Sequence, residues 1–194
     1  MKRPLLLAFA VCIALSSCKK KTESAADDLP VKETVGGVAL IDYDSPKGAF
    51  TCRAPAEWKI REDSSSGTDS MTFIGPLSGN RLAFINILQY PHGPDDPWKD
   101  ARKYAESFWE ITPDNKQPVL ETQKIGDRDA IRFHFEKPFR KPHSKKIEYM
   151  QRLDYALIPV KGGFFELWHT APVGSHQETL PVFEAVVRSF KPKI

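Results

Sequence analysis

Histidine, arginine and carboxylate side chains recur at alternating positions along the strands that the sequence predicts after residue 128. They are Arg132, His134 and Glu136 on the first strand, Glu148, Arg152 and Asp154 on the second, and His169 on the last. Side chains two or four positions apart on a strand point to the same face of a sheet. If the three faces coincide, two imidazoles and several carboxylates form a pocket suited to a metal ion or to acid–base chemistry.

The same polar residues also fit a sheet face that meets water. Cross-strand pairs of opposite charge are common on such faces and contribute about 0.2 to 1 kcal/mol each. We favour this interpretation, so the sequence predicts no metal site, with His134 and His169 as the alternative ligand pair. The motifs of metalloproteases, serine hydrolases and nucleotide-binding sites are missing from the sequence, and we therefore predict a non-enzyme without catalytic residues or cofactor.

A basic segment, KPFRKPHSKK at residues 137–146, follows the first of these strands. It contains five cations and no acidic residue. The cations are Lys137, Arg140, Lys141, Lys145 and Lys146. The simpler interpretation is a solvated hairpin loop. The alternative is a surface for an acidic protein or anionic lipid, because each cation near such a membrane contributes about 1 kcal/mol.

Hydrophobic periodicity places these residues on a sheet with two helices. Strands are predicted at residues 38–41, 49–54, 58–61, 71–74, 82–90, 119–125, 129–136, 147–158 and 164–170. Gly75-Pro76 is expected to end the strand before it, and residues 82–90 are apolar on both faces, which is typical of a central strand. Turns at 126–128 and 161–163 indicate hairpins.

The two predicted helices carry apolar stripes. The first begins at Pro97 and Trp98 behind Asp95 or Asp96 as the N-cap, runs to Trp109 and should bury both tryptophans. The second ends before Pro192, and it begins either at Ser175 or near Thr179. The predicted fold class is therefore α+β, an antiparallel β-sheet flanked by helices on both faces.

Composition limits the classes of function. Hydrophobic residues make up 41% of the chain, which is ample for the core of a single domain. Removing residues 1–17 takes away Lys2 and Arg3 and lowers the formal net charge from +3 to +1, so a general nucleic-acid binder is not expected. Cys52 is left as a lone cysteine in the domain, and we expect it to pack in the core.

The N-terminal residues predict where the protein is located in the cell. Lys2 and Arg3 precede an apolar run of 11 residues, Leu5 to Leu15, too short to span a bilayer but typical of a secretory signal. Leu15-Ser16-Ser17-Cys18 resembles the lipobox of bacterial lipoproteins, whose cysteine is acylated and becomes the new N-terminus. The resemblance implies that Cys18 carries acyl chains such as palmitate, which would hold the protein on a membrane. Lys19 after the cysteine further implies the outer membrane, facing the periplasm.

These features divide the chain into three segments. Residues 1–17 form the predicted signal peptide, residues 18–37 the lipidated cysteine and a flexible polar tether, and residues 38–194 a single domain.

Several short motifs in one order resemble PsbP-like domains, including those of DcrB-like bacterial lipoproteins. They are FTCRAPAEW at 50–58, the aromatic helix at 97–109, the turns at 126–128 and 161–163, and VRSFK at 187–191. The resemblance implies an α/β/α sandwich and an accessory or binding role, with no catalytic residue to carry over. The expected function is a lipid-anchored envelope protein that binds a protein partner or assists assembly. The alternative is a small-ligand or metal-binding domain, conceivably hydrolytic, that uses the His134/His169 face.

Overall fold

The computed structural model describes residues 30–63, 70–78, 81–91, 95–110, 112, 116–141, 143 and 146–193. The predicted signal peptide, the predicted lipidation site at Cys18 and Lys145 of the basic segment lie outside the described residues. Within the described part of the chain, no helix has the length and apolar character needed to cross a membrane.

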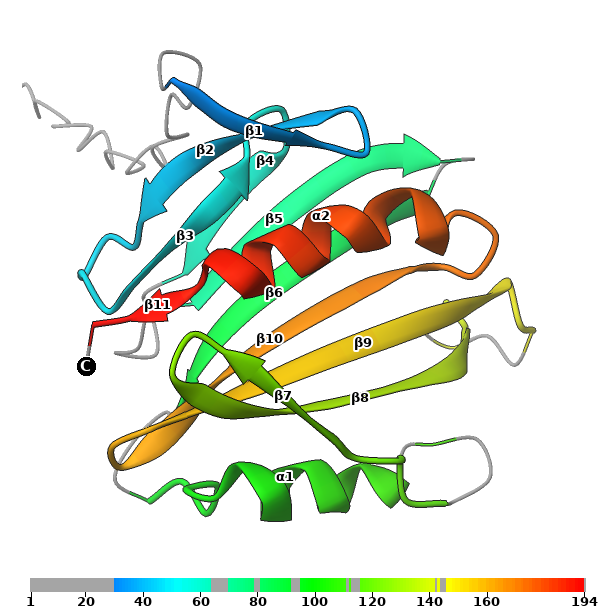
Figure 1. The fold of residues 1–194 in the computed structure, drawn as a ribbon. Coiled ribbons are helices and arrows are strands. Elements are labelled where there is room, and N and C mark those ends of the chain that lie inside the picture. Colours follow the sequence, from blue (N-terminus) through cyan, green and yellow to red (C-terminus); the bar gives the residue numbers. More distant parts are fainter. Residues whose placement is uncertain are drawn as a thin grey trace, which may run out of the picture.

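Two antiparallel sheets form the framework (Figure 1). The smaller has the order β1-β2-β3-β11, and the larger has the order β4-β5-β6-β10-β9-β8-β7. The strands of the smaller sheet are β1 (Val31–Val35), β2 (Val38–Asp44), β3 (Phe50–Pro55) and β11 (Lys191–Pro192). Those of the larger are β4 (Lys59–Asp63), β5 (Ser70–Ser78), β6 (Arg81–Tyr90), β7 (Glu121–Ile125), β8 (Arg128–Phe139), β9 (Tyr149–Val160) and β10 (Gly163–Pro172).

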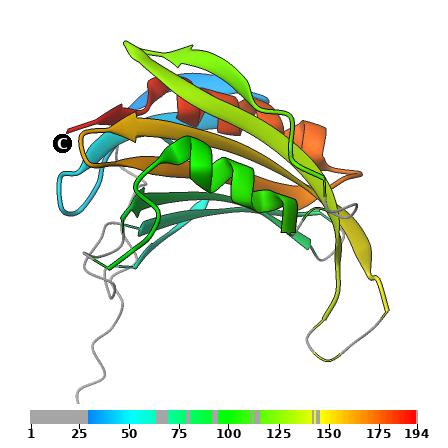
Figure 2. The same cartoon turned by 90° about the horizontal axis from the view of Figure 1, so that it is seen from below.

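Helices cover the two faces of the larger sheet. Alternating residues of β10 separate the two cores: Phe165 packs with the core of α2 (His176–Ser189), and Phe164 with the core of α1 (Ala101–Ser107). A 3₁₀ turn, η1 (Phe108–Glu110), continues α1. In Figure 2, α1 (green) lies in front of the strands of the larger sheet and α2 (red-orange) lies behind them. The predicted α+β class, an antiparallel sheet with helices on both faces, is confirmed.

The smaller sheet lies beside α2 and encloses the same core. β3 alternates as predicted, with Phe50, Cys52 and Ala54 buried against α2 and its neighbours. The sequence did not predict this sheet as a separate unit. Its last strand, β11, is only two residues long and pairs with Phe50 and Thr51 of β3, so its pairing depends on a contact distant in sequence.

The folded part begins earlier than predicted. Residues 31–35 were assigned to the tether, but they form β1. This strand pairs with β2, and Gly36 and Gly37 form the turn between the two strands. Both glycines have positive φ, 58° and 80°, the geometry of a tight hairpin turn. β1 is an edge strand with mostly exposed side chains, so it lacks the apolar signal by which strands are recognised.

Two other boundaries differ from the predictions. Gly75-Pro76 does not end β5, because the strand continues past a register shift between Ile74 and Leu77. The first helix begins at Ala101 rather than Pro97, and its N-cap is Asp100, whose carboxylate accepts from the backbone N–H groups of Arg102 and Lys103. Trp109 is 43% exposed, so the prediction that it lies in the core is wrong.

Candidate functional site

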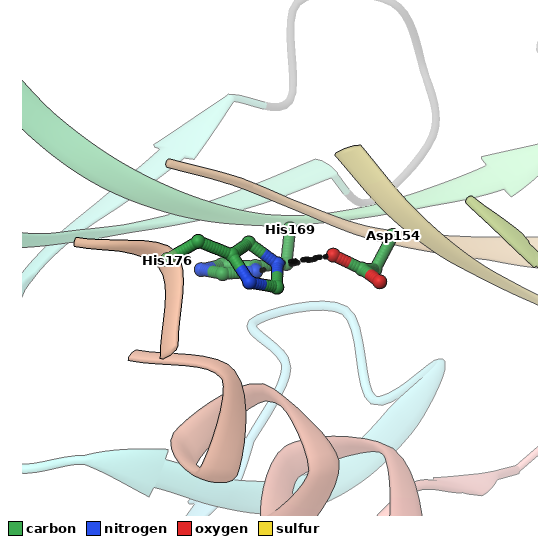
Figure 3. A group of neighbouring side chains, drawn as sticks. All are labelled: Asp154, His169 and His176. Carbon is green, nitrogen blue, oxygen red and sulfur yellow. Dashed lines mark hydrogen bonds and ion pairs between the residues drawn. The ribbon is translucent and has the colours of Figure 1, made fainter. Parts of the chain in front are cut away.

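Three potential metal ligands converge where β9, β10 and the first turn of α2 meet (Figure 3). Asp154 of β9 lies directly opposite His169 of β10, and His176 is the first residue of α2. His176 Nε2 is hydrogen-bonded to Asp154 Oδ2, and His169 Nδ1 lies 3.9 Å from the same oxygen. One ligand atom from each residue lies within 4.8 Å of those of the other two.

This group, the Asp154–His169–His176 cluster, is closed to solvent. His169 is 0% exposed, His176 1% and Asp154 6%. The His169 ring stacks on Phe183 of α2 with 5.6 Å between the ring centroids. Burial of polar groups is costly unless partners compensate, and the Nδ1 atoms of both histidines lack a hydrogen-bond partner among the described residues.

The electrostatics of the cluster favour an ionised carboxylate. Burial opposes ionisation of Asp154, but the neighbouring His169 and His176 side chains and the charge of Arg152 outweigh it, so its pKa is lowered. Burial also lowers the pKa of His169, an effect that Asp154 only partly offsets. At neutral pH these shifts leave a carboxylate facing a His169 ring that is neutral.

A second set of bonds orients these side chains. His169 Nε2 lies 2.9 Å from Thr179 Oγ1, and that hydroxyl lies 3.4 Å from the carbonyl oxygen of His176. Asp154 Oδ1 accepts from the Arg152 guanidinium, with both Nε and one terminal nitrogen at 3.4 Å. The side chains of His169 and Asp154 are therefore each held by a partner outside the cluster.

The predicted His134/His169 pair is only half present in this cluster. The register places His134 and His169 on either side of Asp154, so the polar residues of β8, β9 and β10 do share one face. His134, however, is exposed, and the third member of the cluster is His176 instead. Sequence reasoning missed His176 because it left open whether the helix began at Ser175 or near Thr179.

Other members of the predicted polar face form ion pairs. Arg132 pairs with Glu184 of α2 and lies over the Phe183 ring, 5.3 Å from its centroid. Glu136 lies opposite Arg152 in the sheet register. The prediction that this face meets water is therefore wrong where α2 covers it, because Asp154 and His169 are buried and Arg132 pairs with a helix residue.

A relay of Thr179, His169 and Asp154 would resemble the triad of a hydrolase. Such a relay needs a hydroxyl that a substrate can reach. Thr179 and His169 are both buried, and the Thr179 hydroxyl is within reach of the His176 carbonyl. The geometry therefore favours ion binding or a structural role for the cluster over acyl transfer.

A second buried polar group lies on the opposite face of β10. Glu166 accepts a hydrogen bond of 3.0 Å from the Tyr104 hydroxyl, which lies 3.3 Å from that of Tyr90. Burial raises the pKa of Glu166 to about 7, although the bonds from Tyr104 and Tyr90 lower it in part. Burial likewise raises the pKa of Tyr90 to about 12. This group joins α1 to the sheet.

The predicted basic segment lies at the end of the β8–β9 hairpin, which extends away from the body in Figure 2. Arg140, Lys141 and Lys146 are exposed, and Lys141 is 3.0 Å from Glu148. Lys137 is partly buried, and burial lowers its pKa. Three of the four described cations are therefore displayed to solvent.

Apolar side chains are also exposed at this end of the molecule. Met150 of β9 and Val173, just after β10, are 40% and 39% exposed, and the Val173 N–H donates to the Met150 carbonyl at 3.0 Å. Ile147 is 48% exposed. We call Ile147, Met150 and Val173, with Arg140, Lys141 and Lys146, the hairpin-end surface.

A cavity of about 520 Å³ lies between the smaller sheet and the C-terminal end of α2. Its lining mixes acidic and basic side chains, and two of them, Arg53 and Glu33, pair with each other. Cys52 also lines it, but burial and then Asp44 raise the pKa of its thiol. The thiol is thus kept protonated, which agrees with the predicted packing role rather than with a nucleophile.

No family model and no curated protein matches this chain. Three solved structures are similar to it in fold. A Bacteroides thetaiotaomicron protein is 19% identical, with 79% of this chain and 48% of that one covered and a TM-score of 0.46. PA94 of Pseudomonas aeruginosa, a protein of unknown function described as a candidate regulator, is 14% identical over 80% and 98% of the two chains, with a TM-score of 0.47.

The third structure is a cyanobacterial PsbP from Synechocystis, 15% identical over 79% of this chain and 92% of that one, with a TM-score of 0.48. The likeness to these three structures concerns the fold alone. This chain spans about half of the Bacteroides protein.

Proposed function

We propose that this protein is a lipid-anchored accessory factor of the bacterial cell envelope, which binds a protein partner through the hairpin-end surface. The observation that carries the proposal is the combination of exposed apolar and cationic side chains at one end of the domain. Protein interfaces typically have an apolar centre, in which methionine is enriched, and a polar rim. Met150 and Val173 would form the centre, and the cations would form the rim.

The positive charge of the rim indicates what kind of protein surface the partner would present. Arg140, Lys141 and Lys146 are exposed on one hairpin end, so the surface complements a protein face that is acidic around an apolar depression. Charged rims mainly raise the rate of association and lose this effect at high salt. Lysine and arginine near an anionic bilayer would act in the same way, and the experiments must distinguish the two.

The predicted anchor sets where the partner lies. Only 12 residues separate Cys18 from Val31, where β1 begins. Even fully extended, this segment spans at most about 45 Å. An acylated Cys18 would therefore keep the domain close to the membrane surface, and the partner would be a protein of the same compartment, which we propose to be the periplasmic face of the outer membrane.

Photo-crosslinking tests the partner directly. A crosslinking amino acid replaces Met150 in the full-length protein, and adducts are analysed in membranes of the producing cells. The matched control places it at Val31, which is 57% exposed but belongs to the smaller sheet. We expect a discrete protein adduct from position 150 that weakens when Arg140, Lys141 and Lys146 are changed to Glu. Equal adducts from both positions would contradict the proposal.

Two further measurements address the anchor and the lipid. Cys18→Ala should release the protein from the membrane fraction, and an unchanged distribution would rule out the lipid anchor. The released protein is then sedimented with vesicles containing anionic phospholipid. Binding that the triple Glu variant abolishes would assign the hairpin-end surface to lipid instead of protein.

A further inference from the structure

We propose that Asp154, His169 and His176 bind one zinc ion through Oδ2, Nδ1 and Nε2, respectively. The ion would join the first turn of α2 to β9 and β10, and it would take the place of the proton between His176 Nε2 and Asp154 Oδ2, which is released to solvent on binding. This inference goes beyond the proposed partner-binding role, because the three side chains are buried inside the domain rather than displayed at the hairpin-end surface.

The positions of the three residues suit a shared ion. They come from three elements, and their potential ligand atoms already lie within 4.8 Å of one another (Figure 3). Zinc bonds to imidazole nitrogen and carboxylate oxygen are about 2.0 to 2.2 Å long. In a tetrahedral site two such ligands are about 3.4 Å apart, so the 3.9 Å between His169 Nδ1 and Asp154 Oδ2 would shorten by about half an ångström when the ion binds.

The hydrogen bonds of Thr179 determine which His169 nitrogen is unprotonated and so presents its lone pair to the Asp154 carboxylate. When the Thr179 hydroxyl donates to the His176 carbonyl, it accepts from His169 Nε2–H. The neutral ring then carries no proton on Nδ1, which has no partner among the described residues. A lone pair thus faces a carboxylate oxygen in a site without solvent, and a cation between them would turn this repulsion into two bonds.

Asp154 is oriented for the same role. Its two oxygens are used separately: Oδ1 faces the Arg152 guanidinium, and Oδ2 faces both histidines. A partner on the second oxygen commonly orients a carboxylate that ligates a metal, just as Thr179 orients His169. The cluster therefore contains both the ligands of a metal site and two of the groups that support such ligands.

The donor set selects the class of ion. Two imidazole nitrogens and one carboxylate oxygen are typical of zinc, whereas calcium and magnesium prefer oxygen ligands alone. The three protein ligands leave a fourth position for water. Because the cluster is buried, zinc would bind as the domain folds or when the first turn of α2 opens, so metal binding and stability should be linked.

Without an ion, the same residues make a simpler structure. His176 Nε2–H would donate to Asp154 Oδ2, and His169 Nδ1 would stay unsatisfied. This arrangement accounts for the His176–Asp154 hydrogen bond but gives no reason for zinc to stabilise the domain. The two possibilities therefore differ in how stability responds to zinc.

The test uses the full-length protein, unfolded in guanidinium chloride with EDTA, freed of both and refolded with or without zinc chloride. Zinc per chain is measured after gel filtration, and Co²⁺ is used as a visible-absorbing substitute. We expect about one ion per chain and a folding equilibrium about 100-fold more favourable when free zinc is 100 times the dissociation constant. The corresponding rise in Tm should be reversed by EDTA and not reproduced by Mg²⁺.

Two substitutions and a matched control locate the ion. His169→Gln and His176→Gln should each lower zinc affinity by more than about 100-fold, since even supporting residues contribute 10- to 100-fold. His134→Gln alters an exposed histidine next to Asp154 in the sheet and should change nothing. If either buried variant does not fold, the zinc content of the unaltered protein and the rise of its Tm with zinc test the proposal. A Tm indifferent to zinc, or zinc lost only with His134, would overturn the proposal.

Discussion

The Tyr104 hydroxyl of α1 lies 3.0 Å from the Glu166 carboxylate of β10 and donates a hydrogen bond to it. This bond crosses the core between the helix and the sheet, where Glu166 is 4% exposed. Neutral tyrosine hydroxyls do not replace the hydration of a carboxylate. Burial therefore raises the pKa of Glu166 from 4.5 to about 7, even though the tyrosines lower it in part.

We predict that this carboxyl group makes the domain less stable as the pH rises from about 4.5 to about 7. Below that range Glu166 is protonated in both the folded and the unfolded chain. Within it the unfolded chain releases the proton first, so ionisation favours unfolding, and above it the penalty is constant. The shift corresponds to about 3 kcal/mol, taking 1.36 kcal/mol per pH unit, and denaturant unfolding across this range measures it.

Glu166→Gln provides the matched control. The amide fits the same space and accepts the Tyr104 hydrogen bond but does not ionise. The variant should lose most of the decrease in stability between pH 4.5 and pH 7, whereas Glu178→Gln, on the first turn of α2, should keep it. An unchanged pH profile in Glu166→Gln would show that other groups produce the decrease.

The sequence predicts most of this fold because apolar residues repeat with clear periods. Residues 82–90 and 147–158 are recognisable as strands, and both lie in the larger sheet as β6 and β9. β1 and β11 escape prediction, since one is a largely exposed edge strand and the other is two residues long. β11 is held by pairing with β3, which is distant in sequence and so is not encoded by local patterns, whereas β1 pairs with the neighbouring β2 but lacks an apolar alternation.

The candidate cluster was predictable only in part, for a related reason. Alternation along β9 and β10 places Asp154 and His169 on a shared face, and the register confirms it. His176 reaches them from the helix that follows, and its place depends on where α2 begins. Because Pro181 lies inside the helix, local signals left a start at Ser175 and a start near Thr179 equally open. Tertiary packing therefore decides whether His176 joins the cluster.

Gly163→Ala should destabilise the domain by about 3 kcal/mol or more. A Cβ atom at this position would lie 2.0 Å from the Tyr90 carbonyl oxygen and 2.8 Å from Pro91 Cδ. Because the first is a backbone atom of the paired strand β6, the strands must separate to admit the methyl group. Urea unfolding measures the loss. Gly174→Ala, where nothing lies within 4 Å, should change stability by less than about 1 kcal/mol.

Asp100→Ala should reduce stability by about 1 kcal/mol. The Asp100 carboxylate accepts from the backbone N–H groups of Arg102 and Lys103 at 2.8 and 3.0 Å, and these bonds lower its pKa. Asp95→Ala is the control, because the sequence suggested that residue as the cap. Thermal unfolding at neutral pH compares them, and equal losses would mean that the Asp100 cap contributes no more than a surface charge.

Thr179 connects the stability of the domain to the proposed zinc ion. Its hydroxyl lies 2.9 Å from His169 Nε2, and both groups are buried. Thr179→Val keeps the shape but leaves the ring N–H unpaired, which should cost about 1 to 3 kcal/mol. Thr179→Ser keeps the hydroxyl and should retain most of the stability.

The two variants should also differ in metal binding. Without its partner, His169 can rotate or place its proton on Nδ1, and the ligand lone pair is lost. Thr179→Val should therefore lower zinc affinity by about 10- to 100-fold, the usual effect of removing such a support, while Thr179→Ser stays near the unaltered protein. Competition with a fluorescent zinc chelator measures both constants. Equal zinc affinities in the two variants would show that the Thr179 hydroxyl does not contribute to zinc binding. Thr179 would then have a role in packing and stability alone.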